Sequence, residues 1–185
     1  MQRDLVERAK KGDHDAFEAL TAAAFDRLYT VARRILRDAD RADDAVQECL
    51  VRAWRDLRAL RDPDRWDAWL IRLLINACRD EGRRQRRRGP EIRVIPIDRA
   101  APGDAANDLA DRDQLERGFR RLNIDQRTVL VMHHYLGLRP SEIAETLGIP
   151  IGTVHSRLHY ATTALRAVLE ADARTAMAAA GGRSA

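Results

Sequence analysis

One stretch of the chain, residues 138 to 169, constrains the fold more than any other. It reads LRPSEIAETLGIPIGTVHSRLHYATTALRAVL, a short helix followed by a longer amphipathic one. Gly148 stands where a left-handed residue ends a helix, and Pro150 suits a helix start because its missing N–H is not needed there. The apolar residues of the second helix recur at steps of four and three: Val154, Leu158, Ala161, Leu165 and Val168. This arrangement is typical of a helix-turn-helix motif.

The opposite face of the second helix carries small polar, aromatic and basic groups. Between Gly152 and Val168 the sequence has no Asp or Glu. DNA phosphate repels carboxylates, and a solvated face normally mixes both signs of charge, so this absence favours DNA binding. We therefore predict that residues 152–163 enter a DNA major groove. An antiparallel helix pair in an ordinary bundle has the same periodicity, so that alternative stays open at this point.

The composition of the chain narrows its class. A length of 185 residues suits one domain or two small ones, and the scarcity of strand-like alternation predicts an all-α protein. Cys49 and Cys78 lie far apart without a CxxC pattern, which indicates reduced, buried thiols in a cytoplasmic protein. We expect neither a signal peptide nor membrane insertion, because no apolar run approaches the ~20 residues that span a bilayer.

The N-terminal part reads as a set of helices, two of them within residues 3–37 with a break at Gly12. A third, over residues 41–58, is amphipathic, and its outer face is acidic in the N-terminal half. That face includes Asp44, Gln47 and Glu48. It is interpreted either as a solvated face that complements the helix dipole or as a docking surface for a partner.

A loop over residues 59–65 precedes a long helix predicted from residue 66 to residue 84. The exposed side of this helix carries a basic row at steps of four, three and four: Arg72, Asn76, Arg79 and Arg83. An Asn within a row of arginines can read a base edge, whereas arginine alone would hold phosphate. A solvated basic helix end is the other interpretation.

Residues 89–110 differ sharply in composition, with three prolines and two glycines, and are predicted to form a flexible linker. The expected organisation is a first helical domain over residues 1–88 and a second over 111–170. A tail over 171–185 is expected to fray.

No pattern in the sequence indicates catalysis, a cofactor or a metal. The sequence has no glycine-rich phosphate loop, nucleophile elbow or zinc-protease motif. His133 and His134 are adjacent, so they do not share a helix face, and structural roles are expected for both. Within the second domain, Asp125 is expected to cap a helix.

Three segments, in this order, resemble the bacterial RNA polymerase sigma factors of the extracytoplasmic-function (ECF) type. Residues 43–54 (DDAVQECLVRAW) are similar to the core-binding segment of that family. Residues 66–84 are similar to its segment for the promoter −10 element, and residues 122–169 to its −35-reading domain. The resemblance extends over about residues 5–169, and implies two small helical domains joined by a flexible linker.

The resemblance also implies a role for each matching residue. Core-polymerase binding falls to Asp44, Gln47 and Glu48. Contacts to −10 DNA fall to Asp64, Arg65, Arg72, Asn76, Arg79, Asp80, Arg83 and Arg84. Contacts to −35 DNA fall to Thr153, His155, Ser156, Arg157, His159 and Tyr160. The implied partners are promoter DNA, an anti-sigma factor, and the RNA polymerase core at the clamp helices of its largest subunit and at its flap region.

Some positions depart from the family pattern. Arg139 replaces a Ser that usually caps the first helix of the motif, and His155 stands where Lys is frequent. The recognition helix therefore carries less fixed charge than is usual. Two alternatives to a sigma factor remain: a stand-alone helix-turn-helix regulator, which would not need the acidic face at residues 43–48, and a helical interaction module that does not bind DNA.

Overall fold

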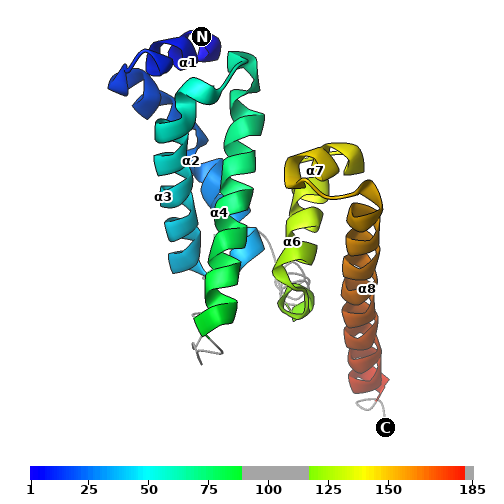
Figure 1. Cartoon of the computed structure of the whole chain (residues 1–185). Helices are drawn as coiled ribbons and strands as arrows, with labels where there is room; N and C mark the ends of the chain where they lie inside the picture. The colour runs from blue at the N-terminus through cyan, green and yellow to red at the C-terminus, as the bar shows by residue number, and fades with distance from the viewer. Residues whose placement is uncertain (89–116, 182–185) are drawn as a thin grey trace. The chain divides into compact units, whose positions relative to one another are not determined.

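The computed structural model describes residues 1–88 and 117–181, with the side chains of residue 88 and of residues beyond 171 left out. The described residues form helices joined by turns, and no strand occurs among them (Figure 1). The all-α prediction is therefore confirmed. The chain divides into two compact units, Met1–Val94 and Ile95–Ala185. The predicted linker, residues 89–110, lies outside the described residues.

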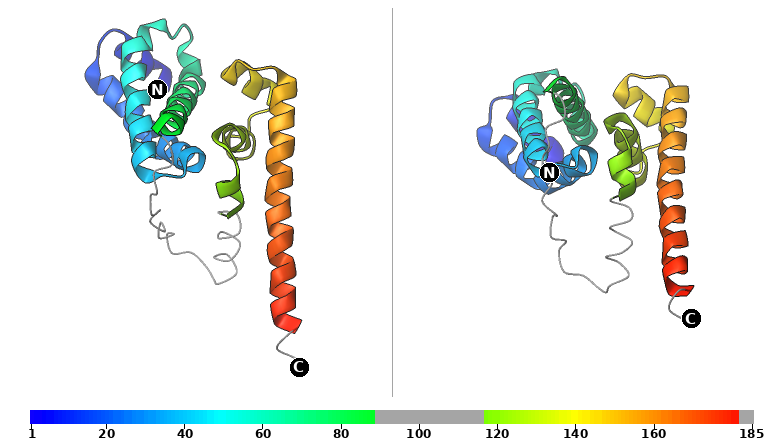
Figure 2. Two further views of the ribbon diagram at one scale, coloured as in Figure 1. Left: turned by 60° about the horizontal axis from the view of Figure 1, so that its bottom comes forward. Right: turned by 90° about the horizontal axis from the view of Figure 1, so that it is seen from below.

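Residues 1–88 of the first unit form the α-helices α1 (Gln2–Lys10), α2 (His14–Leu36), α3 (Ala39–Asp56) and α4 (Trp66–Arg88). Helices α2, α3 and α4 contact one another and lie side by side in the views of Figure 2. Their contacts bury mostly apolar side chains: Leu28, Val31, Ile35, Val46, Cys49, Ala53, Trp66, Leu70, Leu74 and Ile75. Each side chain of Leu or Ile size that is fully buried contributes about 1.5–3 kcal/mol, so this core holds the unit together.

Two aspartates fix where α2 and α3 begin. The Asp13 carboxylate, directly after the break at Gly12, accepts a hydrogen bond from the N–H of Ala16 at 3.0 Å. The Asp38 carboxylate accepts from the N–H of Arg41 at 3.1 Å. Because Asp38 is the cap, α3 begins two residues before the predicted start at residue 41.

The segment expected to be a loop, residues 59–65, is more ordered than predicted. A short 3₁₀ turn, η1 (Leu57–Ala59), ends at the first residue of this segment, and a second, η2 (Pro63–Arg65), forms its last three residues. Helix α1 braces it, because Lys10 Nζ donates to the carbonyl of Leu60 at 2.8 Å. Arg3 Nη1 also pairs with Asp64 at 2.6 Å.

In the second unit, the described residues start with a helical segment at residues 117–121. It continues with α6 (Ile124–Leu130), a π-helical turn η3 (Val131–Tyr135), α7 (Pro140–Leu147) and α8 (Ile151–Gly181). The buried core includes Val129, Met132, Ile143, Val154, Ala161 and Val168, and Leu158 and Leu165 are half-buried. The predicted apolar stripe of the second helix therefore faces the core. Helix α8 runs to Gly181, so the tail expected to fray from residue 171 is helical up to that residue.

The start of α6 differs from the prediction. Asn123, not Asp125, is the cap: its side-chain oxygen accepts from the N–H of Gln126 at 2.9 Å. The Gln126 side chain accepts in return from the N–H of Asn123 at 3.0 Å, which completes a capping box. The cap prediction for Asp125 was wrong, because the box satisfies two backbone N–H groups where a single aspartate would satisfy one.

The helix-turn-helix geometry follows the prediction. Gly148 adopts the left-handed conformation, with φ 63° and ψ 38°. The N–H of Ile149 donates to the carbonyl of Ala144 at 3.2 Å, and that of Gly148 to the carbonyl of Glu145 at 3.4 Å. These two bonds close the end of α7 in a Schellman arrangement. At its start, Glu142 accepts from the N–H of Arg139 at 2.8 Å. Arg139 itself provides no side-chain cap, so the function of the usual Ser is not replaced, and Pro140 occupies the first helical position.

The left-handed turn predicts opposite effects for two glycines. Gly148→Ala should lower the free energy of unfolding of the second unit by about 1–2 kcal/mol, because a Cβ disfavours positive φ. Gly152→Ala, inside α8, is the matched control and should raise it by up to about 1 kcal/mol. Amide hydrogen exchange in α7 and α8 measures both changes. Equal exchange rates in the two variants would contradict the role given to Gly148.

Candidate polymerase and nucleic-acid interfaces

The polar face of α8 is an open surface. His155, Ser156, His159 and Tyr160 are exposed, and Thr153 is partly exposed. The Tyr160 residue is 64% exposed and its ring meets that of His159 edge-on, with centroids 5.8 Å apart. Five of the six residues predicted for −35 DNA therefore lie where another molecule can reach them.

Arg157, the sixth, has a different environment. Its Nη2 donates to the Asp125 carboxylate at 3.2 Å, and its side chain is only 24% exposed. Its Nη1 is buried without a hydrogen-bond partner among the described residues. Arg157 thus joins α8 to α6. Asp125, expected as a cap, is instead the carboxylate that holds the recognition helix in place.

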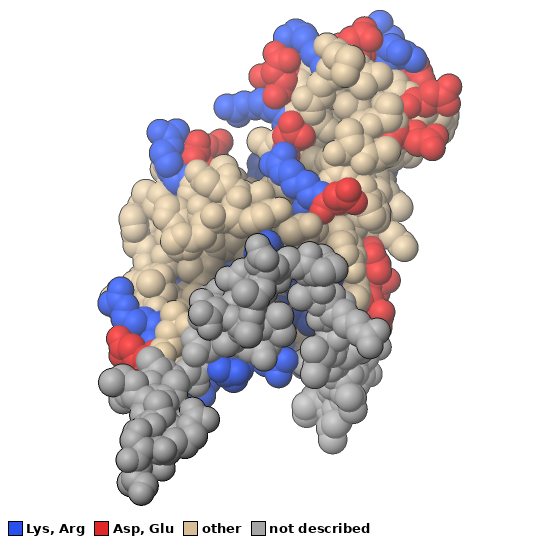
Figure 3. Space-filling model, turned by 180° about the vertical axis from the view of Figure 1, so that it is seen from behind, with Lys and Arg blue, Asp and Glu red and all other residues tan. Residues whose placement is uncertain are grey.

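On the face shown in Figure 3, charged side chains are unevenly distributed over the described residues. In the view of Figure 3 the second unit, which contains α8, shows mostly uncharged surface, whereas basic and acidic side chains are interspersed over the first. Along residues 152–168, the charged residues are Arg157 and Arg166. This helix can therefore offer hydroxyl, imidazole and phenol groups to DNA but little fixed charge.

The outer face of α3 keeps the predicted polar residues outside. Asp44 and Gln47 are exposed, and Val51, one helical turn further on, is 61% exposed. The Glu48 side chain is only 38% exposed, because it accepts a hydrogen bond from Arg52. The predicted polymerase-binding face thus consists of two open polar residues, an open valine and one carboxylate that already has a cation.

The basic row of α4 lies along its surface as predicted. Arg72 and Arg83 are exposed, and Asn76 and Arg79 are partly exposed. Arg84, which follows the row, is exposed and pairs with Glu81 at 3.4 Å. The described geometry therefore brings the predicted row together on one helix.

The predicted −10 residues from η2 stand next to α1. Asp64 and Arg65 are both exposed. Asp64 pairs with Arg3 at 2.6 Å, and Gln2 Nε2 donates to the Asp67 carboxylate at 3.1 Å, so α1 contacts both this turn and the first turn of α4. These two contacts were not predicted from the sequence, because their partners are separated by 61 and 65 positions along the chain and meet only in the folded unit.

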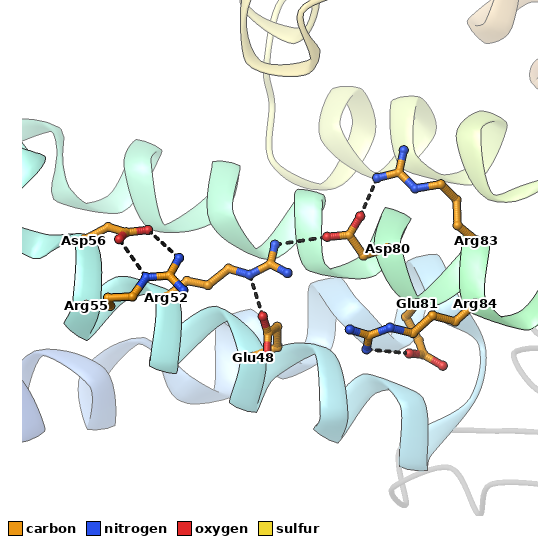
Figure 4. A network of polar contacts seen from close by, with 8 residues as sticks. All are labelled: Glu48, Arg52, Arg55, Asp56, Asp80, Glu81, Arg83 and Arg84. Atoms are coloured by element: carbon orange, nitrogen blue, oxygen red, sulfur yellow. Dashed lines mark hydrogen bonds and ion pairs between the residues drawn. The ribbon is translucent and has the colours of Figure 1, made fainter.

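A polar network joins α3 to α4 (Figure 4). Arg52 Nε donates to Glu48 at 2.6 Å, and Arg52 Nη1 donates to Asp80 at 3.1 Å. The second oxygen of Asp80 accepts a hydrogen bond from Arg83. Partial burial acts to raise the pKa of Asp80, but the hydrogen bonds from Arg83 and Arg52 outweigh it and lower that pKa. The Asp80 carboxylate is therefore charged at neutral pH.

Sequence analysis missed Arg52. The sequence does indicate its pairing with Glu48, because Glu48 and Arg52 are four residues apart in the favourable order for an ion pair within a helix. Partial burial acts to lower the pKa of Arg52, but its hydrogen bonds to Glu48 and Asp80 outweigh that effect and raise it. Its partner on α4 lies 28 residues further along the chain, so the spacing of the sequence could not reveal it.

The two cysteines lie in the core of the first unit, and His133 contacts the turn that follows η3. Burial raises the pKa of Cys49 to about 12 and also raises that of Cys78, so both thiols stay protonated and unreactive. Nδ1 of His133 lies 2.9 Å from the carbonyl oxygen of Leu138. Among the described residues, no group of three or more His, Cys, Asp or Glu could hold a metal ion.

The described helices are not membrane-spanning segments. None of them combines enough length with enough apolar character to cross a bilayer.

Comparison with known proteins agrees with the geometry of both units. The Sigma-70 region 2 model matches residues 22–88, and the Sigma-70 region 4 model matches residues 112–165. The ECF RNA polymerase sigma factor SigL of Mycobacterium tuberculosis is 36% identical over 160 residues, which are 82% of this chain and 90% of SigL. SigW of Bacillus subtilis is 29% identical over 181 residues, which are 90% of this chain and 95% of SigW.

Solved structures show the same likeness. The sigma factor RpoE of Bartonella quintana, crystallised with the anti-sigma factor NepR, superposes with a TM-score of 0.69 at 25% identity, over 84% of this chain and 98% of RpoE. CnrH, in complex with the cytosolic domain of CnrY, superposes with a TM-score of 0.64 at 28% identity, over 92% and 98%.

The two matched regions, each on its own helical unit, define a sigma-70-type transcription initiation factor. Within that class the chain belongs to the ECF RNA polymerase sigma factors. The resemblance found in the sequence is therefore confirmed. Sigma factors are transcription factors and are not known as enzymes.

The environment of Arg157 predicts that its first role is structural. Arg157→Ala should lower the free energy of unfolding of the second unit by about 1–3 kcal/mol, because it removes the charged hydrogen bond between α8 and α6. The exposed His155→Ala is the matched control and should leave stability unchanged. Hydrogen exchange of α6 and α8 measures both. If Arg157→Ala left stability unchanged but reduced the salt dependence of DNA binding, Arg157 would be a surface contact to phosphate.

Proposed function

We propose that this sigma factor binds the RNA polymerase core in the cytoplasm, carries it to a specific set of promoters and opens them. It supplies no catalytic group and needs no cofactor. In this proposal residues 1–88 bind core and −10 DNA, residues 89–110 link the domains, and residues 111–170 bind −35 DNA. The observation that carries it is the first unit, in which an open acidic face on α3 and a basic row on α4 belong to one helical bundle.

Two partners are proposed for the α3 face and for the second unit. Asp44, Gln47 and Glu48 would dock on the clamp helices of the largest polymerase subunit, where a carboxylate face fits basic or polar side chains. The second unit would rest at the flap region of the polymerase and place α8 over the −35 element.

The −10 contacts are proposed for the row on α4 and for η2. Arginines of the row would hold the phosphates of the opened strand, and Asn76 would reach a base edge. The predicted set remains Asp64, Arg65, Arg72, Asn76, Arg79, Asp80, Arg83 and Arg84. Exposure supports Arg65, Arg72, Arg83 and Arg84 most directly.

The −35 contacts are proposed for Thr153, His155, Ser156, Arg157, His159 and Tyr160. Their short polar and aromatic side chains suit hydrogen bonds and apolar contacts to base edges in the major groove. Of these six residues, Arg157 is the one whose environment least supports a direct DNA contact, because it is paired with Asp125.

An anti-sigma factor is proposed as a further partner. The similar structures RpoE and CnrH were both solved as complexes, the first with the anti-sigma factor NepR and the second with CnrY. A protein of this kind would hold the free sigma factor inactive by covering surfaces that otherwise meet the polymerase.

Run-off transcription with purified core polymerase and genomic promoter fragments tests the proposal. Adding the chain should produce transcripts that begin at defined positions and are absent with core alone. A stand-alone regulator would bind DNA without core and produce no new start site, and an interaction module would do neither. Absence of any promoter-specific transcript would therefore reject the sigma function.

The open part of the α3 face predicts a defect in core binding. Asp44→Arg combined with Gln47→Ala should weaken the affinity for core by about tenfold or more, because it reverses the charge that faces the polymerase. Both residues are exposed, so the fold should be unaffected. Glu18→Arg, an exposed charge reversal on α2, is the matched control. Pull-down with core measures the effect, and equal affinities of the two variants would contradict the assignment.

The basic row predicts a change in salt dependence. Arg72→Ala should lower the slope of log K against log salt for single-stranded −10 DNA by about 0.7, because one phosphate contact disappears. Arg55→Ala removes the same charge from an exposed position on α3, where Arg55 pairs with Asp56 at 2.9 Å, and should keep the slope. Titration of the holoenzyme at several salt concentrations measures both. An unchanged slope for Arg72→Ala would mean that this arginine is merely solvated.

A further inference from the structure

We infer that Arg52 is a positioning residue. Through Asp80, it orients Arg83 for contact with −10 DNA. It also holds the Glu48 side chain on the polymerase-facing side of α3. Arg52 itself touches neither partner. This inference rests on the proposed function of the two faces.

The geometry of the guanidinium carries the first step. Arg52 reaches carboxylates on two helices, Glu48 on its own helix at 2.6 Å and Asp80 on α4 at 3.1 Å (Figure 4). Its side chain is only 22% exposed. The planar guanidinium has five N–H donors in a fixed fork, so it can hold two carboxylates in defined positions where a lysine would act as a single point charge.

The second step concerns the other side of Asp80. One oxygen of Asp80 accepts from Arg52 and the other from Arg83. The Arg83 side chain remains 61% exposed, so it is available at the surface while one of its nitrogens is held. The position of Asp80 therefore determines where Arg83 points, and Arg52 determines the position of Asp80.

The same contacts explain why a carboxylate, that of Asp80, can lie next to arginines that are proposed to bind DNA. An unpaired Asp80 would repel phosphate, but two guanidinium groups compensate its charge. We therefore assign Asp80 to the positioning of Arg83 rather than to a direct contact with the −10 strand.

Arg52 is not the sole contact between α3 and α4, so its loss can be tested in a folded protein. The apolar contacts between α3 and α4 are buried independently of it. A separate ion pair, Arg41 with Glu81 at 4.0 Å, also joins the same two helices. Loss of Arg52 should therefore leave the first unit folded while Asp80 and Arg83 lose their fixed orientation.

The experiment measures binding of single-stranded −10 DNA to the holoenzyme formed by the full chain and core polymerase. Arg52→Gln should weaken binding by about threefold to tenfold. It should also lower the salt slope by about 0.7, as Arg83→Gln does, because the phosphate contact of Arg83 is lost. In an Arg83→Gln background, Arg52→Gln should cause no further loss of affinity or slope. Arg55→Gln, the matched control on α3, should change neither.

Each other outcome overturns the inference. An unchanged slope for Arg52→Gln means that Arg52 does not act on Arg83, and additive losses in the double variant mean that Arg52 contacts phosphate itself. Thermal unfolding verifies that the variant is folded. If it is not, Asp80→Asn breaks the same link from α4 and must show the same slope loss and the same lack of additivity with Arg83→Gln. If wild-type holoenzyme binds the −10 strand no better than core alone, the proposed function fails instead.

Discussion

The apolar contact between α3 and α4 determines what the first unit can present to its partners. Helix α4 buries Leu70, Leu74 and Ala77, and α3 buries Val46, Cys49 and Ala53. An α-helix has 3.6 residues per turn, so burying one stripe of each helix leaves the residues of the opposite side exposed to solvent. On α4 the outward residues form the basic row, and on α3 they form the acidic face. Both proposed binding faces are therefore consequences of one packing arrangement, and neither can be moved without disturbing the core.

That arrangement brings carboxylates close to a surface proposed to bind DNA, and arginines compensate them. Asp80 accepts from Arg52 and Arg83, and Glu81, which is 8% exposed, lies within ion-pair distance of Arg41 and Arg84. Because hydrogen bonds lower the pKa of Asp80 in the folded state, its contribution to stability is present above the ordinary carboxyl range. It is lost as the pH falls through the lowered pKa. The network is thus intact at neutral pH, where promoter binding takes place.

Helix faces and several helix ends could be predicted from the sequence, because they depend on local periodicity and on short-range hydrogen bonds. The Asp13 cap and the left-handed Gly148 are of this kind. The error at Asp125 was avoidable, since Asn123 followed by Gln126 is a capping-box pattern. The residues beyond 170 were expected to fray, whereas α8 extends to Gly181, and the many alanines there favour helix. Arg52–Asp80 and Arg157–Asp125 could not be predicted, because their partners lie 28 and 32 residues apart.

These two long-range pairs change how the arginines of this chain should be counted. In each unit, one arginine next to a predicted DNA surface is bound to an aspartate of a neighbouring helix, so the number of arginines overstates the charge available to phosphate. The effect is largest on α8, where Arg157 supplies the only charge between residues 152 and 163. Phosphate contributes most of the affinity of a typical DNA-binding protein. Under the proposed function, α8 therefore supplies recognition of the −35 element more than affinity. The arginines of α4 and the polymerase would supply most of the affinity, which explains why such a helix can function within a holoenzyme although it would bind DNA weakly by itself.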